Sequence, residues 1–181
     1  MPQPVIDATV GGASANSYAT PAWAGAYFAD KLESERWVAF PEEDRARALI
    51  AATARVEEES PFWDVPYDTW TPQALYFPRR CDRDPSGVLV VPDRVKIACA
   101  ELALHLLQQR AAPELVDRLA LQAQGVETVQ VGEVQERFRG EGTDLPLKVQ
   151  RLLSPFIRRA VRIVTESCAP RRHWTDGWVA L

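Results

Sequence analysis

Six prolines are spaced so closely between residues 60 and 92 that no long helix can form there. Each proline removes a backbone N–H group and restricts the residue before it. The prolines are Pro61, Pro66, Pro72, Pro78, Pro85 and Pro92. Six large aromatic residues lie between them: Phe62, Trp63, Tyr67, Trp70, Tyr76 and Phe77. Because exposing such apolar surface is unfavourable, the segment is predicted to be an ordered loop packed on a core, with a turn at 84–87 and a short strand at 88–91.

Helical periodicity dominates the rest of the chain. Thr20 and Pro21 are typical of a helix start, and the first helix is predicted over about 20–32. The spacing of apolar residues predicts a second helix over about 42–59. The strongest pattern runs from Asp93 to Ala112, where apolar residues cover more than one face, so this helix is expected to be central. A last helix is expected from Leu147 to Val161, which Pro155 breaks or restarts.

The predicted fold class is mainly α, a small helical bundle with a β-hairpin. Alternating residues on both sides of Gly132 and Glu133 place the hairpin at about 126–139. The predicted organisation is an extended N-terminal arm (1–19), a helical domain (20–162) that includes the Pro- and aromatic-rich loop, and an extended C-terminal tail (163–181).

Charge is distributed unevenly in this chain of 181 residues, whose formal net charge is −4. Residues 1–60 carry a net charge of −5 and residues 143–181 a net charge of +4. This asymmetry fits a head-to-tail self-contact or an acidic partner, and two solvated surfaces are the alternative. Three cysteines without a CxxC pair predict no disulfide scaffold and a reducing cytoplasm. No signal peptide and no apolar run long enough to span a bilayer is recognised, so no membrane is expected.

Chemistry-bearing residues do not cluster, and the protein is predicted not to be an enzyme. His105 lies in a leucine-rich helix and is interpreted as structural, and His173 has no evident partner. The run 57–59 is all glutamate, and a solvated helix face is favoured over an acid–base pair. No catalytic residue, cofactor site or metal site is expected.

Two groups of residues remain as candidate binding sites. Arginines next to aromatic side chains can hold single-stranded nucleic acid, and the residues here are Tyr76, Phe77, Arg79, Arg80 and Arg83. The alternative is an aromatic loop with arginines reaching out from it. The tail carries basic and tryptophan residues suited to docking on another subunit, namely Arg171, Arg172, Trp174 and Trp178. Folding of the tail back on its own domain is the alternative.

The order of several short motifs resembles one group of phage proteins over about residues 10–160. The motifs are Asn16-Ser17-Tyr18, Ala26-Tyr27-Phe28, Trp37, the stretch from Ala48 to Thr53, the stretch from Gln73 to Arg79, Val91-Pro92, and the stretch from Val95 to Ala103. The group is often labelled DnaT-like and is similar to the head-to-tail adaptor (connector, head-completion) proteins of tailed phages. Nothing after residue 160 takes part in the resemblance.

The resemblance implies a non-enzymatic adaptor in the neck of a virion, assembled in the host cytoplasm. It implies a ring, usually of twelve copies, that binds the portal protein on one side and a neck or stopper protein on the tail side. DNA would pass through the central hole. The tail takes no part in the resemblance, and its composition alone leads to the expectation that Arg171, Arg172, Trp174 and Trp178 dock on the portal. The DnaT-like label implies a different function, a replication protein that binds single-stranded DNA.

Overall fold

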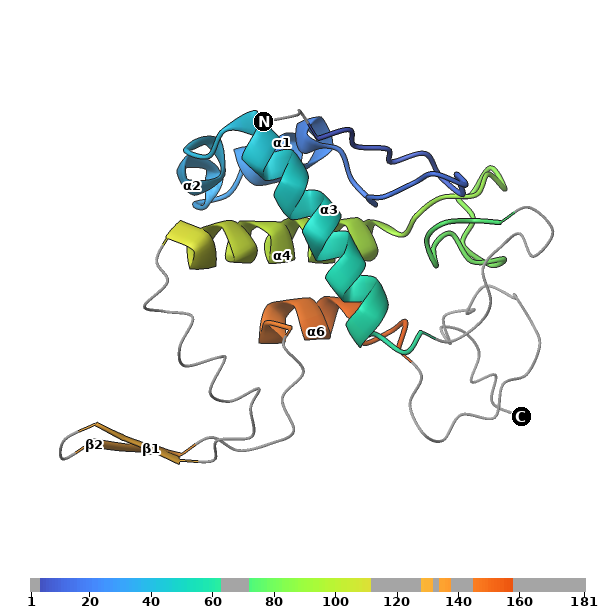
Figure 1. Cartoon of the computed structure of the whole chain (residues 1–181). Helices are drawn as coiled ribbons and strands as arrows, with labels where there is room; N and C mark the ends of the chain where they lie inside the picture. The colour runs from blue at the N-terminus through green and yellow to red at the C-terminus, as the bar shows by residue number, and fades with distance from the viewer. Residues whose placement is uncertain (1–3, 63–71, 112–127, 132–133, 138–144, 158–181) are drawn as a thin grey trace, which may run out of the picture.

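The computed structural model describes residues 4–62, 72–111, 128–131, 134–137 and 145–157 (Figure 1). Five helices are present in this part of the chain: α1 (Pro21–Ala29), α2 (Ser34–Val38), α3 (Glu42–Glu59), α4 (Asp93–Ala111) and α6 (Leu147–Leu153). Two short strands, β1 (Thr128–Val131) and β2 (Val134–Arg137), pair antiparallel. The prediction of a mainly helical protein is therefore confirmed. Both strands fall within the segment expected to form the hairpin, and residues 132–133 lie outside the described residues.

The helix starts follow local chemistry. The Thr20 hydroxyl accepts a hydrogen bond from the Trp23 N–H at 3.1 Å and Pro21 occupies the first turn, as predicted for an N-cap. This helix ends at Ala29, three residues earlier than expected, and the short helix α2 follows. Helix α3 begins after Pro41 with three carboxylates in its first turn, where the helix dipole favours negative charge.

Helix α4 is the centre of the molecule, as its sequence predicts. In Figure 1, α3 crosses α4, and α6 runs along α4. Helix α1 also contacts α4. Val95, Ala98, Cys99 and Leu102 are fully buried in it. Its alanines allow the neighbouring helices to approach closely, so α4 is buried on several sides.

The segments without helices pack on this bundle. In the predicted N-terminal arm, Asn16 bridges the Asp7 N–H at 2.8 Å and the Val5 carbonyl at 2.9 Å, and Tyr18 belongs to the core. After the loop of residues 72–92 turns at Asp84, only an isolated bridge between Arg83 and Leu89 forms, in place of the strand expected at 88–91. The side chain of Asp84 accepts hydrogen bonds from two backbone N–H groups of this turn, which bends the chain away from an extended strand.

The last helix is broken at Pro155, which is one of the two outcomes expected there, and residues 158–161 of the expected helix lie outside the described residues. Helix α6 ends at Leu153, two residues before Pro155, which cannot supply a helical N–H group. Cys99 has a free, buried thiol, and burial raises its pKa to about 12. Cys81 is disulfide-bonded, and its partner lies outside the described residues. A disulfide is therefore present in a chain for which the sequence predicted no disulfide scaffold.

Candidate functional site

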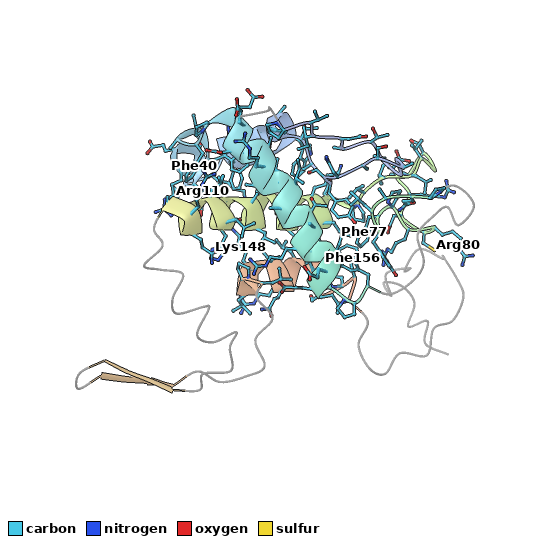
Figure 2. The ribbon with its side chains drawn as sticks, viewed as in Figure 1. Phe40, Phe77, Arg80, Arg110, Lys148 and Phe156 are labelled. Atoms are coloured by element: carbon cyan, nitrogen blue, oxygen red, sulfur yellow. The ribbon has the colours of Figure 1, made fainter. Side chains whose placement is uncertain are left out.

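Phe77, the central aromatic residue of the expected DNA contact, is buried. Its side chain is 1% exposed and lies among the rings of Tyr18, Phe62, Tyr76 and Phe156, with centroid separations of 4.8 to 5.8 Å. We call these five rings the aromatic cluster. Figure 2 shows Phe77 and Phe156 pointing toward one another. Phe77 belongs to the Pro-rich loop, and Phe156 belongs to the segment that follows α6. A nucleic-acid base has no access to the Phe77 ring in this conformation.

Arg79 is buried as well, at 4% exposure, and is fully engaged with protein groups. Its guanidinium donates to both carboxylate oxygens of Asp82, at 2.9 and 2.8 Å. It also lies over the rings of Phe77 and Phe156, 5.0 and 5.1 Å from their centroids. Bidentate pairing of this kind fixes an arginine in place, so Arg79 secures the loop and does not reach solvent.

The other three residues of the expected DNA contact are more exposed than Phe77 and Arg79. Tyr76 is half-buried, with its hydroxyl donating to the Phe62 carbonyl at 3.2 Å. Arg83 is exposed and donates to the Gly87 carbonyl at 2.6 Å. Arg80 is exposed and points away from the bundle (Figure 2). The five residues therefore do not form one accessible aromatic and basic surface.

Glu57 differs from the solvated glutamate that its sequence context predicts. It accepts a hydrogen bond from the Tyr18 hydroxyl, and another from the Tyr76 N–H at 2.9 Å. Burial raises the pKa of Glu57, against the two hydrogen bonds, which lower it. Burial and the neighbouring Glu57 also raise the pKa of Tyr18 well above its usual range. The carboxylate therefore connects α3 to the N-terminal segment and to the Pro-rich loop. This structural role could not be predicted from a run of three glutamates.

Glu101 is a second buried carboxylate, and its sequence gave no signal for it. Its Oε1 accepts a hydrogen bond from the Tyr27 hydroxyl at 2.6 Å and lies 2.7 Å from Lys148 Nζ and 3.8 Å from Lys31 Nζ. It therefore connects α1, α4 and α6. Burial, followed by the bond to Glu101, raises the pKa of Tyr27. The same residue lines a hollow of about 180 Å³ beside His105, whose pKa is lowered by burial and by Arg55.

The described residues contain no group of three or more His, Cys, Asp or Glu side chains able to hold a metal ion. The hollow beside His105 is lined by Glu101 and Lys148, which already pair with each other. No nucleophile in it is placed next to a base. No helix among the described residues is both long and apolar enough to cross a membrane.

A further exposed surface is a corner of the molecule at residues 29–43, which contains α2 and the start of α3; we call it the acidic corner. Leu32 is 98% exposed and Val38 is 65% exposed. The corner holds five carboxylates against two basic residues. Asp30, Glu35 and Glu42 are exposed and form no ion pair with any residue in the described part of the chain. The two exposed apolar side chains and the three carboxylates that lack ion pairs among the described residues make this corner a candidate binding surface.

No pattern in the sequence predicts this corner. Leu32 and Val38 are single apolar residues among charged ones, a pattern that fits either face of a short helix. Phe40 lies at the same end of the molecule as Arg110 (Figure 2), which pairs with Asp44 at 3.2 Å. The expected docking residues Arg171, Arg172, Trp174 and Trp178 lie outside the described residues.

Residues 4–168 match the family model described as "Putative DnaT-like ssDNA binding protein". No curated protein and no solved structure matches the chain. The family match covers nearly all of the chain, including every helix described above. The chain therefore belongs to this DnaT-like protein family.

Proposed function

We propose that this protein is a non-enzymatic assembly subunit, a head-to-tail adaptor that joins the portal to the tail of a tailed phage or phage-like particle. Its copies form a ring through which DNA passes. The observation that carries the proposal is the acidic corner, where Leu32 and Val38 stand in water beside unpaired carboxylates. Such a surface repels a polyanion and suits a protein partner. The partner class comes from the resemblance of the motif order to adaptor proteins, which the sequence suggests.

A ring requires two different surfaces on each subunit, because neighbouring copies in a ring meet through heterologous contacts. The acidic first third and the basic last fifth of the sequence provide such a pair. The buried pairs Arg79–Asp82 and Tyr18–Glu57 hold the loop and the N-terminal segment on the bundle. These contacts fix the described loop and N-terminal segment to the helices that carry the acidic surface.

The test is size-exclusion chromatography with light scattering of the protein mixed with the portal protein encoded beside it. We expect both proteins to elute together, at a mass that includes many copies of this chain. A Leu32→Glu/Val38→Glu double variant should lower the number of copies bound. A Val5→Glu/Val88→Glu variant, which changes two exposed valines elsewhere, should bind as the unchanged protein does. Separate elution of protein and portal, with and without DNA, would contradict the proposal.

Single-strand DNA binding is the second candidate, favoured by the family description and by the exposed Arg80 and Arg83. Burial of Phe77 and Arg79 removes the stacking ring and the arginine that the sequence offered for this function. Fluorescence anisotropy of a labelled single strand at low salt separates the two functions. Binding that weakens steeply with salt and is lost in Arg80→Ala/Arg83→Ala would favour the second.

A further inference from the structure

The acidic corner and the point where the described chain ends lie at opposite ends of α3. The corner includes the first residues of α3, whereas Ile157 pairs with Phe62, three residues after α3 ends at Glu59. A helix of 18 residues is roughly 27 Å long. Figure 1 shows the same separation, with α2 beside one end of α3 and α6 beside the other. The chain therefore continues toward its C-terminus from the end remote from the corner.

The residues that follow Ile157 complement the corner in composition. Residues 158–181 contain five arginines against two carboxylates, and they carry Trp174 and Trp178. The corner offers the opposite set, three exposed carboxylates without ion pairs and two exposed aliphatic side chains. Tryptophan and arginine are the residues that contribute most to binding energy at protein interfaces.

We propose that the acidic corner binds the C-terminal segment of a second copy of this chain, head to tail. Trp174 and Trp178 pack on Leu32 and Val38, and the arginines pair with Asp30, Glu35 and Glu42. The inference rests on the proposed adaptor function, because it names the contact between neighbours in the ring. It assigns the tail to the next subunit and not to the portal.

The position of the two surfaces favours a second copy over the chain's own tail. To reach its own corner, the segment would have to run back along the whole of α3 as an extended strap, which costs conformational freedom along its length. A neighbour placed in the same orientation brings its tail directly to the corner. When this contact repeats, each copy binds one neighbour through its tail and the other neighbour through its corner, as a closed ring requires.

Two full-length variants test the contact by complementation. The corner variant is Leu32→Glu/Val38→Glu and the tail variant is Trp174→Ala/Trp178→Ala. We expect each alone to self-associate at least about tenfold more weakly than the unchanged protein, as loss of an interface anchor does. An equimolar mixture has one intact corner and one intact tail, so light scattering should find a heterodimer that does not grow further. High salt should weaken association of the unchanged protein, and the Val5→Glu/Val88→Glu control should behave as unchanged.

Three results would overturn the inference. The first is a mixture that stays monomeric, which would mean that the tail docks on its own corner or nowhere. The second is self-association that neither variant alters. The third is loss of portal binding in the tail variant alone, with self-association intact, which would place the tail on the portal and leave the adaptor function standing. If the mixture dimerises but the unchanged protein never binds the portal, the contact holds and the adaptor function fails.

Discussion

At the C-terminal end of α3, five aromatic rings close around an arginine and a glutamate, whereas at its N-terminal end two aliphatic side chains stand in water among carboxylates. Both regions mix large apolar and charged residues. Beside the aromatic cluster, Arg79 pairs with Asp82, and Glu57 accepts a hydrogen bond from Tyr18. In the acidic corner, Asp30, Glu35 and Glu42 have no ion pair among the described residues.

This difference separates stability from binding. A charged group that is buried without a partner lowers the stability of the folded protein. Charged groups in water cost little and stay available to another molecule. The comparison therefore predicts that substitutions in the aromatic cluster act on folding, and that substitutions in the acidic corner act on association.

The largest expected effect is that of Phe77→Ala. Removal of a fully buried ring that contacts four others leaves a cavity and should lower the free energy of unfolding by about 3–5 kcal/mol. Urea denaturation followed by tryptophan fluorescence measures the change, with Phe77→Leu as a milder control. A loss below about 1 kcal/mol would mean that the ring does not belong to the core, and it would revive the DNA-binding reading.

Asp82→Ala should come next. It leaves the Arg79 guanidinium buried without its carboxylate, since the two side chains are only 5% and 8% exposed. The expected loss is about 3 kcal/mol, as for a broken buried pair. Asp93→Ala, which removes a surface pair with Lys96 at 3.6 Å, is the control and should cost little. Equal effects from both variants would refute the distinction between the buried pair and surface pairs.

Glu57→Gln should change how stability depends on pH. Because the pKa of Glu57 is raised in the folded protein, its stabilising contribution is complete below the ordinary value of 4.5 and is lost as pH rises through the folded pKa. The stability of the unchanged protein relative to Glu57→Gln should therefore fall from acidic to neutral pH. Unfolding curves at several pH values measure this, and Glu58→Gln is the exposed control. A difference that is constant with pH would contradict the prediction.

The smallest effect on folding is expected for Leu32→Glu. The side chain is 98% exposed, so the free energy of unfolding should change by less than about 0.5 kcal/mol. Thermal unfolding of a monomeric dilute sample is the measurement. A large destabilisation would show that Leu32 supports the fold, and the contrast between the two ends of α3 would then disappear.

Local signals predicted much of the fold correctly. Helix α3 spans the predicted residues 42–59, and α4 ends one residue before its predicted end. Apolar residues recur at helical spacing in both segments, and this signal can be read within each segment alone. Thr20 and Pro21 placed the start of α1, but its end was misplaced because Asp30 to Glu33 carry no breaking residue. The candidate site was less predictable: Tyr76, Phe77 and Arg79 have the composition of a DNA contact, and only their partners show that they face inward.

From sequence alone, the protein is a mainly helical, proline-punctuated chain with an acidic beginning and a basic end. These properties follow from the order of residue types, since helix periodicity, proline geometry and charge are local. Tertiary structure decided which charges are buried and which are exposed. Glu57 and Glu101 find partners 19 and 47 or more residues away in one folded body, whereas the side chains of Leu32 and Val38 stay exposed. Burial depends on what the rest of the chain places beside a residue, and that is why the acidic corner appears only in the folded molecule.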